Sequence, residues 1–425
     1  MIPFICICFF VLLFMGVPIA VILGVTTTAS LIFFSDTSLY IVVQQLFNAL
    51  DNFVLLAIPY FILAGAIMTR GGIAKRLITF VNALVGWFPG GLAMAGILGC
   101  IFFAAISGSS PATVVAIGSI MIPALIKSGY GEKFSLGLIT SAGSLGIMIP
   151  PSIPMILYCL VMNVSVAEIF MAGVLPGLLI GAVLMIYTFI LAKVKNWRLE
   201  STFSMSEIFR TAKEGVWALM LPFVVLGGIY SGVFTPTEAA AVSVVYSLFV
   251  EMFIYKEFGF DAITDICKDA AVLSACLLFI LSCAMTFIWL LTAEQVPQQL
   301  ADIIIRHIDS PWMFLLSVNI LFLVLGCFMD DVSAMLVLAP IFLETLNRYG
   351  IDLVHFGVVM VLNIQLGMLT PPFGLNLFVS SGITGKPLTT IAMGVLPFIA
   401  VMLICLMLIT YIPWISLVLP NLLLK

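Results

Sequence analysis

One sequence pattern occurs twice in this chain, each time within strongly apolar sequence. The first copy begins with Ser107-Gly108-Ser109-Ser110-Pro111 and, after a helical stretch, reaches Gly146-Ile147-Met148-Ile149-Pro150-Pro151. The second begins with Met329-Asp330-Asp331-Val332-Ser333 and reaches Gly367-Met368-Leu369-Thr370-Pro371-Pro372 in the same way. Apolar segments that are interrupted at corresponding positions in two halves are typical of the binding sites of secondary transporters. The repetition therefore indicates solute transport.

The composition places the chain in a membrane. Apolar residues make up 63% of it and charged residues 8%, against about 45–50% and about 25% in soluble domains. Because about 20 apolar residues cross a bilayer as a helix, and because the runs are continuous, we expect an all-α polytopic protein and not a β-barrel. The expected apolar segments are 2–34, 53–69, 78–106, 111–127, 133–160, 162–192, 216–234, 236–254, 270–292, 311–329, 332–347, 354–382 and 388–418.

Two pairs of segments suggest re-entrant hairpins. The stretches 92–106 and 111–126 cover only some 22 Å each as helices of about fifteen residues, and four small residues separate them. Irregular backbone at membrane depth is tolerated where protein or a water-filled cavity satisfies it. The pair 311–329 and 332–347 predicts a second hairpin with two aspartates at its tip. The alternative for each pair is two full spans joined at the surface.

A polar connection divides the chain into two halves of comparable length. It holds a cluster of basic residues, at Lys193, Lys195, Arg198, Arg210 and Lys213. The positive-inside tendency places this connection, 193–215, in the cytoplasm. Each half carries one copy of the pattern, and we favour an inverted relation between the halves. Residues 198–214 fit either an amphipathic helix on the membrane surface or a solvated loop.

Each proline pair removes backbone donors from a helix. Since proline lacks an N–H, the carbonyls four residues earlier lose their partners, and a dry carbonyl then needs a donor or a cation. Unwound carbonyls that coordinate coupling ions are a known transporter pattern, so we expect a small hard cation such as Na⁺ here, and coupling to a cation or to protons stays open. The alternative is a packing kink without a ligand. The candidate sodium ligands are Ser107, Gly108, Ser109, Ser110, Gly146, Ile147, Asp330, Asp331, Ser333, Gly367, Met368 and Thr370.

The two tips also offer helix starts to an anion. Ser110 before Pro111 fits an N-cap followed by the first helical position, and Asp331 could cap the helix that follows the second tip. A positive helix end in a low-dielectric cavity attracts an anion, and a carboxylate substrate fits best. The candidate substrate contacts are Ser109, Ser110, Pro150, Pro151, Asp330, Pro371 and Pro372.

Other functional classes find little support. Adjacent aspartates face different directions, which argues against an intramembrane aspartyl protease, and no P-loop is present. The nine cysteines include no CxxC pair and fit buried small hydrophobes, and neither histidine has a partner at metal-ligand spacing. No basic patch points to nucleic acid. We expect no enzymatic activity, no organic cofactor and no metal beyond Na⁺. The N-terminus fits a retained first span rather than a signal peptide.

Several strings resemble the large membrane subunit of tripartite ATP-independent periplasmic (TRAP) transporters, the dicarboxylate-type large permease family. The strings that carry the resemblance, from about residue 10 to 415, are Ile58-Pro59-Tyr60-Phe61-Ile62-Leu63-Ala64-Gly65, Gly71-Gly72-Ile73-Ala74, Phe234-Thr235-Pro236-Thr237-Glu238-Ala239-Ala240, Phe328-Met329-Asp330, His355-Phe356-Gly357-Val358-Val359-Met360 and Leu369-Thr370-Pro371-Pro372-Phe373-Gly374-Leu375-Asn376-Leu377. One position departs from the family, which often has a small residue where this chain has Asp331. Whether Asp331 is a cation ligand or a cap stays open.

The resemblance implies a sodium-driven carboxylate importer of the bacterial inner membrane, with an elevator-type fold similar to the ion-transporter superfamily. Its implied partners are a small four-helix membrane subunit and a soluble periplasmic binding protein. The implied domains are scaffold helices in 1–89, half of the moving domain in 90–160, further scaffold in 161–309, the other half in 310–382, and a C-terminal helix in 383–425.

Two other functions stay open, as does the solute. The chain could be a stand-alone sodium/dicarboxylate or citrate carrier that needs no binding protein. It could also be a membrane scaffold or enzyme that transports nothing. No diagnostic cationic side chain at a tip selects among sialic acid, C4-dicarboxylates, keto acids and sulfonates.

Overall fold

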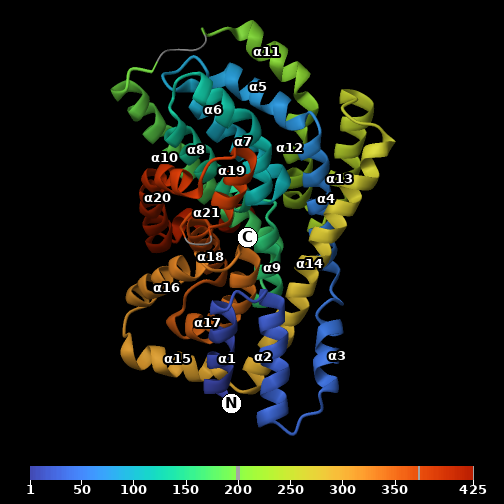
Figure 1. The fold of residues 1–425 in the computed structure, drawn as a ribbon, viewed down its shortest axis with the longest axis vertical. Coiled ribbons are helices and arrows are strands. Elements are labelled where there is room, and N and C mark those ends of the chain that lie inside the picture. The colour runs from blue at the N-terminus through green and yellow to red at the C-terminus, as the bar shows by residue number, and fades with distance from the viewer. Residues whose placement is uncertain (198–201, 372–373, 425) are drawn as a thin grey trace.

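The computed structural model describes residues 1–197, 202–371 and 374–424, and every regular element in these ranges is helical (Figure 1). The first half contains α1 (Ile2–Phe14), α2 (Ile19–Phe34), α3 (Tyr40–Asn48), η1 (Phe53–Leu56), α4 (Ala57–Arg70), α5 (Ile73–Val85), α6 (Gly91–Ser107), α7 (Ser110–Lys127), α8 (Glu132–Gly143), η2 (Ser144–Ile147), α9 (Ile153–Met162) and α10 (Val166–Val194). The second half contains α11 (Met205–Glu214), α12 (Val216–Tyr230), α13 (Pro236–Phe249), η3 (Val250–Tyr255), α14 (Phe260–Ala293), α15 (Val296–His307), α16 (Pro311–Gly326), α17 (Asp331–Tyr349), α18 (Leu353–Gly367), α19 (Leu375–Thr384), α20 (Leu388–Tyr411) and α21 (Trp414–Leu423).

Among the described residues, six helices are long and apolar enough to cross a membrane, or eight if each of two bent pairs forms one span. Shorter apolar helices include α6 and α9. The apolar segments predicted over 133–160 and 354–382 are each interrupted, the first between α8 and α9 and the second between α18 and α19. The chain is thus a multi-pass membrane protein that also contains shorter apolar helices.

The apolar segment predicted over 2–34 is two helices and not one. The chain breaks after α1 because Gly16 adopts a left-handed φ of +73° and Pro18 precedes α2, and proline cannot continue the hydrogen bonds of a helix. The sequence prediction missed this break because Gly and Pro are common within transmembrane helices.

Part of the polar connection forms a helix rather than a loop. In α11, Arg210 donates hydrogen bonds to Glu207 and Glu214, and the bond from Arg210 lowers the pKa of Glu207. Its buried residue is Thr211, and the helix packs against α5. Arg198 and its neighbours lie outside the described residues.

The two halves interlock reciprocally. The second arm of the first hairpin, α7, packs against α19, and the second arm of the other hairpin, α17, packs against α9. Figure 1 shows α6 and α7 in the upper part of the molecule and α16 and α17 in the lower part. Small residues allow further close contacts between the halves, as where a Cβ on Gly137 of α8 would lie 1.9 Å from the Gly394 carbonyl oxygen of α20.

A second group of helices packs beside these broken elements. Helix α4 lies against α13 and α14, and α14 also lies against α2 and α17. Figure 1 shows α14 as a long rod along this side of the molecule. These helices therefore supply a wall to any cavity at the hairpin tips.

Candidate functional site

The first hairpin tip is a turn between α6 and α7. Gly108 ends α6 with a left-handed φ of +61°, and a Cβ there would lie 2.7 Å from the Pro151 carbonyl oxygen. Ser109 has extended backbone and its side chain accepts a hydrogen bond from the Ala112 N–H at 3.5 Å. The N-cap is therefore Ser109 and not Ser110, because Ser110 is already part of the helix. Ser110 occupies the first helical position.

Hydrogen bonds connect the two helices at this tip. The Ser107 hydroxyl lies 3.0 Å from the Thr113 hydroxyl, which donates to the Ser109 carbonyl at 2.8 Å. Ser107 and Thr113 are buried. Thr113 was not among the residues predicted from the sequence.

The first break packs directly on the first tip. A Cβ on Gly146 would lie 2.5 Å from the Ser109 carbonyl oxygen and 2.6 Å from the Thr113 hydroxyl, so only glycine fits. The Ile153 N–H, at the start of α9, donates to the Gly108 carbonyl at 3.3 Å. Within the described part of the chain, no backbone N–H donates to the carbonyls of Gly146 and Ile147. These two oxygens remain available to a cation.

At the second tip, the aspartates divide two roles. Asp330 is the N-cap of α17, and its carboxylate accepts from the Ser333 N–H at 3.2 Å. The prediction that Asp331 caps this helix is thus wrong, because Asp331 already has helical backbone and accepts from the adjacent Val332 N–H at 3.0 Å. The buried Ser333 hydroxyl has no hydrogen-bond partner among the described residues.

The second break differs from the first in its backbone bonding. The Gly367 carbonyl accepts from the Thr370 N–H at 2.8 Å, and the Met368 carbonyl accepts from the Asn376 N–H at 3.3 Å. The expectation that these carbonyls lack donors is therefore wrong, because a tight turn after α18 supplies the Thr370 N–H and the start of α19 supplies the Asn376 N–H. A Cβ on Gly367 would lie 2.5 Å from the Gly326 Cα of α16. Pro372 lies outside the described residues.

Two amide side chains connect the halves behind the tips. Asn376 donates to the Ser110 hydroxyl at 2.7 Å, and Gln365 donates to the Ser144 hydroxyl at 2.6 Å. The oxygen atoms of both amides are buried and have no partner in the described ranges. Neither amide was among the predicted site residues, although polar side chains within apolar helices are themselves a functional indication.

The oxygens gathered around the two breaks suit a hard cation. They comprise hydroxyls, amide oxygens and carbonyls. Several of them are buried without a hydrogen-bond partner, which is rare in native proteins. No group of three His, Cys, Asp or Glu that could hold a metal occurs among the described residues. The donor set therefore matches sodium better than a transition metal, which prefers nitrogen or sulfur ligands.

Both tips line one cavity of about 620 Å³. Five of the predicted site residues reach it: Ser107, Gly108, Ser109, Asp330 and Asp331. The predicted substrate contacts Ser110, Pro150, Pro151 and Pro371 do not line it. Its opposite wall comes from α4 and α14, which contribute mainly apolar side chains and one ion pair between Arg70 and Asp269 at 3.3 Å.

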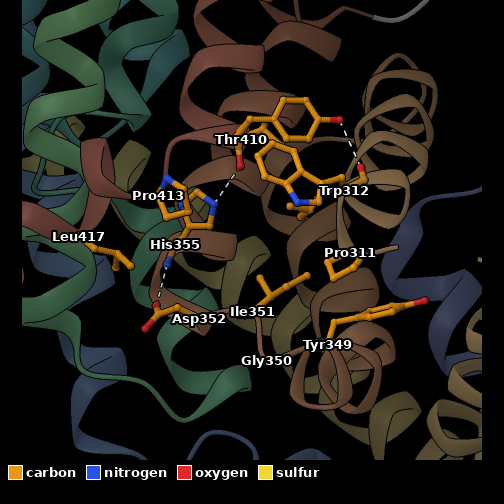
Figure 2. Close-up of a pocket in the computed structure, with 12 residues that line it drawn as sticks. Pro311, Trp312, Tyr349, Gly350, Ile351, Asp352, His355, Thr410, Pro413 and Leu417 are labelled. Atoms are coloured by element: carbon orange, nitrogen blue, oxygen red, sulfur yellow. Dashed lines mark hydrogen bonds between the residues drawn. The ribbon is translucent and has the colours of Figure 1, made fainter. Parts of the chain in front are cut away.

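A second cavity, of about 360 Å³, contains none of the predicted site residues (Figure 2). His355 contacts the Ser416 hydroxyl at 2.8 Å and the Thr410 carbonyl at 3.2 Å, and Asp352 accepts from the backbone of α18. Trp312 and Tyr411 stack with ring centroids 4.9 Å apart. The His355 ring thus joins α18 to α20 and to the start of α21, and Asp352 caps α18.

Comparison with known proteins identifies the family of the chain. Residues 6–415 match the family described as the DctM component of tripartite ATP-independent periplasmic transporters. A C4-dicarboxylate TRAP transporter large permease, DctM of Pseudomonas aeruginosa, is 47% identical over 94% of this chain and 93% of its own length. The sialic acid TRAP transporter large permease SiaM of Vibrio cholerae is 36% identical over 97% of this chain and 96% of its own.

A longer relative and a solved structure extend the comparison. The isethionate TRAP transporter permease DctMQ of Oleidesulfovibrio alaskensis is 41% identical over 95% of this chain and 64% of its own length. The YdaH transporter of Alcanivorax borkumensis shares the fold with a TM-score of 0.58 at 14% identity, over 89% of this chain and 88% of its own. The chain therefore belongs to the DctM component family of tripartite ATP-independent periplasmic transporters.

Proposed function

We propose that this large TRAP permease imports a small carboxylate in a sodium-coupled and binding-protein-dependent way, with a C4-dicarboxylate as the favoured substrate. The observation that carries the proposal is the convergence of two tips from different halves on one cavity. Relatives named for C4-dicarboxylates are 44–47% identical to the chain, and the sialic acid permease SiaM is 36% identical. The relatives named above are permeases, which agrees with a non-enzymatic role.

Sodium would bind where each break meets its tip. At the first, the carbonyls of Gly146 and Ile147 face no backbone donor, and Ser107, Ser109 and Thr113 add oxygens. At the second, the available oxygens belong to side chains, among them Ser333 and the amides of Gln365 and Asn376. The cations would order the tips, since each binds oxygens from segments far apart in the sequence.

Electrostatics explains why the cation would come before the anion. Asp330 and Asp331 line the cavity and repel a carboxylate. Two unit charges about 4 Å apart interact by about 4 kcal/mol at an effective dielectric constant of 20. A sodium ion near these aspartates offsets one of their two charges and so weakens this repulsion, and the N-terminus of α7 then attracts the substrate. Sodium binding and substrate binding would therefore be coupled.

The reciprocal packing of α7 on α19 and of α17 on α9 supports an inverted-repeat arrangement. Residues 90–160 and 310–382 would then move as a unit against α4, α13 and α14, in the manner of an elevator. The chain covers 64% of the longer relative DctMQ, and the remaining part of DctMQ is long enough to contain a small membrane subunit. A small membrane subunit and a periplasmic binding protein would serve this chain in the bacterial inner membrane.

Reconstitution tests the proposal. The chain is purified with its small subunit, placed in liposomes and supplied with the binding protein and labelled succinate. Uptake should require both a sodium gradient and the binding protein. Uptake without the binding protein would favour the stand-alone carrier, and no uptake of any carboxylate would overturn the transport proposal.

A further inference from the structure

A single cationic side chain lines the cavity among the described residues. Arg70, the last residue of α4, lies there beside Asp269 of α14. The cavity stripe of α4 consists of Ile62, Gly65, Ala66, Thr69 and Arg70. This spacing places Arg70 on the same face of the helix as the residues that contact the first tip.

The distance from Arg70 to the first tip suits a small dicarboxylate. A Cβ on Gly65 would lie 3.5 Å from the Ser107 carbonyl oxygen, so Gly65 is level with the tip. Arg70 follows five residues later, which corresponds to about 7.5 Å along the helix axis. An extended four-carbon diacid placed along this wall can therefore meet the tip with one carboxylate and the guanidinium with the other.

The backbone that carries Arg70 is anchored, whereas its side chain is free to change partners. The buried carboxylate of Glu251 accepts from the N–H groups of Gly72 and Ile73, both at 2.9 Å, and thereby fixes the corner after α4. The side chains of Arg70 and Asp269 are 48% and 68% exposed and share one contact. Ion pairs this exposed contribute about 0–1 kcal/mol, so a substrate can compete with Asp269.

We propose that Arg70 is a specificity-determining residue, which binds the second carboxylate of a dicarboxylate in the conformation described here. When the cavity is empty, Asp269 takes the place of that carboxylate. Arginine suits this role because its planar guanidinium binds a carboxylate through two parallel hydrogen bonds. The inference rests on the proposed function, which requires a carboxylate in this cavity.

The test compares succinate with succinamate, in which an amide replaces one carboxylate. Thermal stabilisation of the purified permease complex in NaCl gives the apparent affinity of each compound for wild type, R70Q, R70K and D269N. Wild type should prefer succinate, and R70Q should lower this preference by about tenfold or more, because a charged hydrogen bond is lost. R70K should retain part of the preference, and D269N should bind succinate at least as tightly as wild type.

R348Q provides the matched control. Arg348 forms a comparable exposed ion pair with Asp302 at 2.6 Å but does not line the cavity. R348Q should keep the wild-type preference, and R70Q without ligand should melt as wild type does, which excludes misfolding. If the wild-type complex takes up succinate with sodium but R70Q keeps the wild-type preference for succinate, the role of Arg70 is wrong and the proposed function still stands. If wild type takes up no carboxylate, the proposed function and this inference both fail.

Discussion

Replacing Gly146 by alanine should weaken the response of uptake to sodium. The added methyl group would lie 2.5 Å from the Ser109 carbonyl oxygen and 2.6 Å from the Thr113 hydroxyl. Both neighbours belong to the first tip, and the nearer one is backbone that cannot rotate away. The tip must therefore move from the break, which separates the oxygens that we propose as sodium ligands.

The size of the effect follows from the crowding. An extra methylene group in a packed core costs about 1–3 kcal/mol. If this cost falls on the sodium-bound arrangement, the half-saturating sodium concentration rises by about 5- to 150-fold. Gly227 of α12 gives the matched control, because a Cβ there meets nothing within 4 Å. Alanine at that position should leave the sodium response unchanged.

The assay is a sodium titration of succinate uptake in liposomes that contain the complex and its binding protein. Both variants are first compared with wild type by thermal melting, which identifies any general loss of folding. A half-saturating sodium concentration in G146A equal to that of G227A and wild type would refute the link between the first break and the cation.

Three further predictions use the same preparation. P150A should raise the half-saturating sodium concentration more than P371A. A new N–H at residue 150 would donate to the otherwise free Gly146 carbonyl, whereas the Gly367 carbonyl already accepts from Thr370. Equal effects of the two variants would contradict this difference. D331N should raise the half-saturating sodium concentration by tenfold or more, because a carboxylate that faces a cation loses its charge. An unchanged sodium titration of uptake would show that the Asp331 side chain only contacts backbone. S110A and N376A should each lower the thermal stability, and their double-mutant cycle should give a coupling near the roughly 1 kcal/mol of one hydrogen bond; additive effects would contradict that contact.

The sequence predicted the interruptions of the chain well, because their causes are local. Pro150, Pro151 and Pro371 cannot supply donors, and Gly108 allows a left-handed turn. A pair of prolines, or a glycine at a left-handed turn, interrupts a helix through its own local chemistry. The two breaks and the first hairpin tip could be predicted for this reason.

The contacts between distant segments could not be predicted in the same way. The bond from Asn376 to Ser110, the pair of Arg70 with Asp269, and the cavity wall from α14 depend on how the halves dock. The N-cap at Ser109 and the hydrogen bond to the Gly367 carbonyl depend on the exact backbone dihedral angles at each turn. The neighbouring serines, and the residues after Gly367, are compatible with more than one such turn. Local propensity alone leaves these features undetermined.

The most direct measurement is an electron cryomicroscopy map of the complex with succinate, recorded once in sodium and once in potassium. In sodium, we expect two compact densities, one between the Gly146 carbonyl and the first tip and one near Ser333 at the second tip. We also expect the elongated density of succinate in the cavity. In potassium, these densities should be absent. Identical maps in both salts, with both regions filled only by protein, would contradict the account.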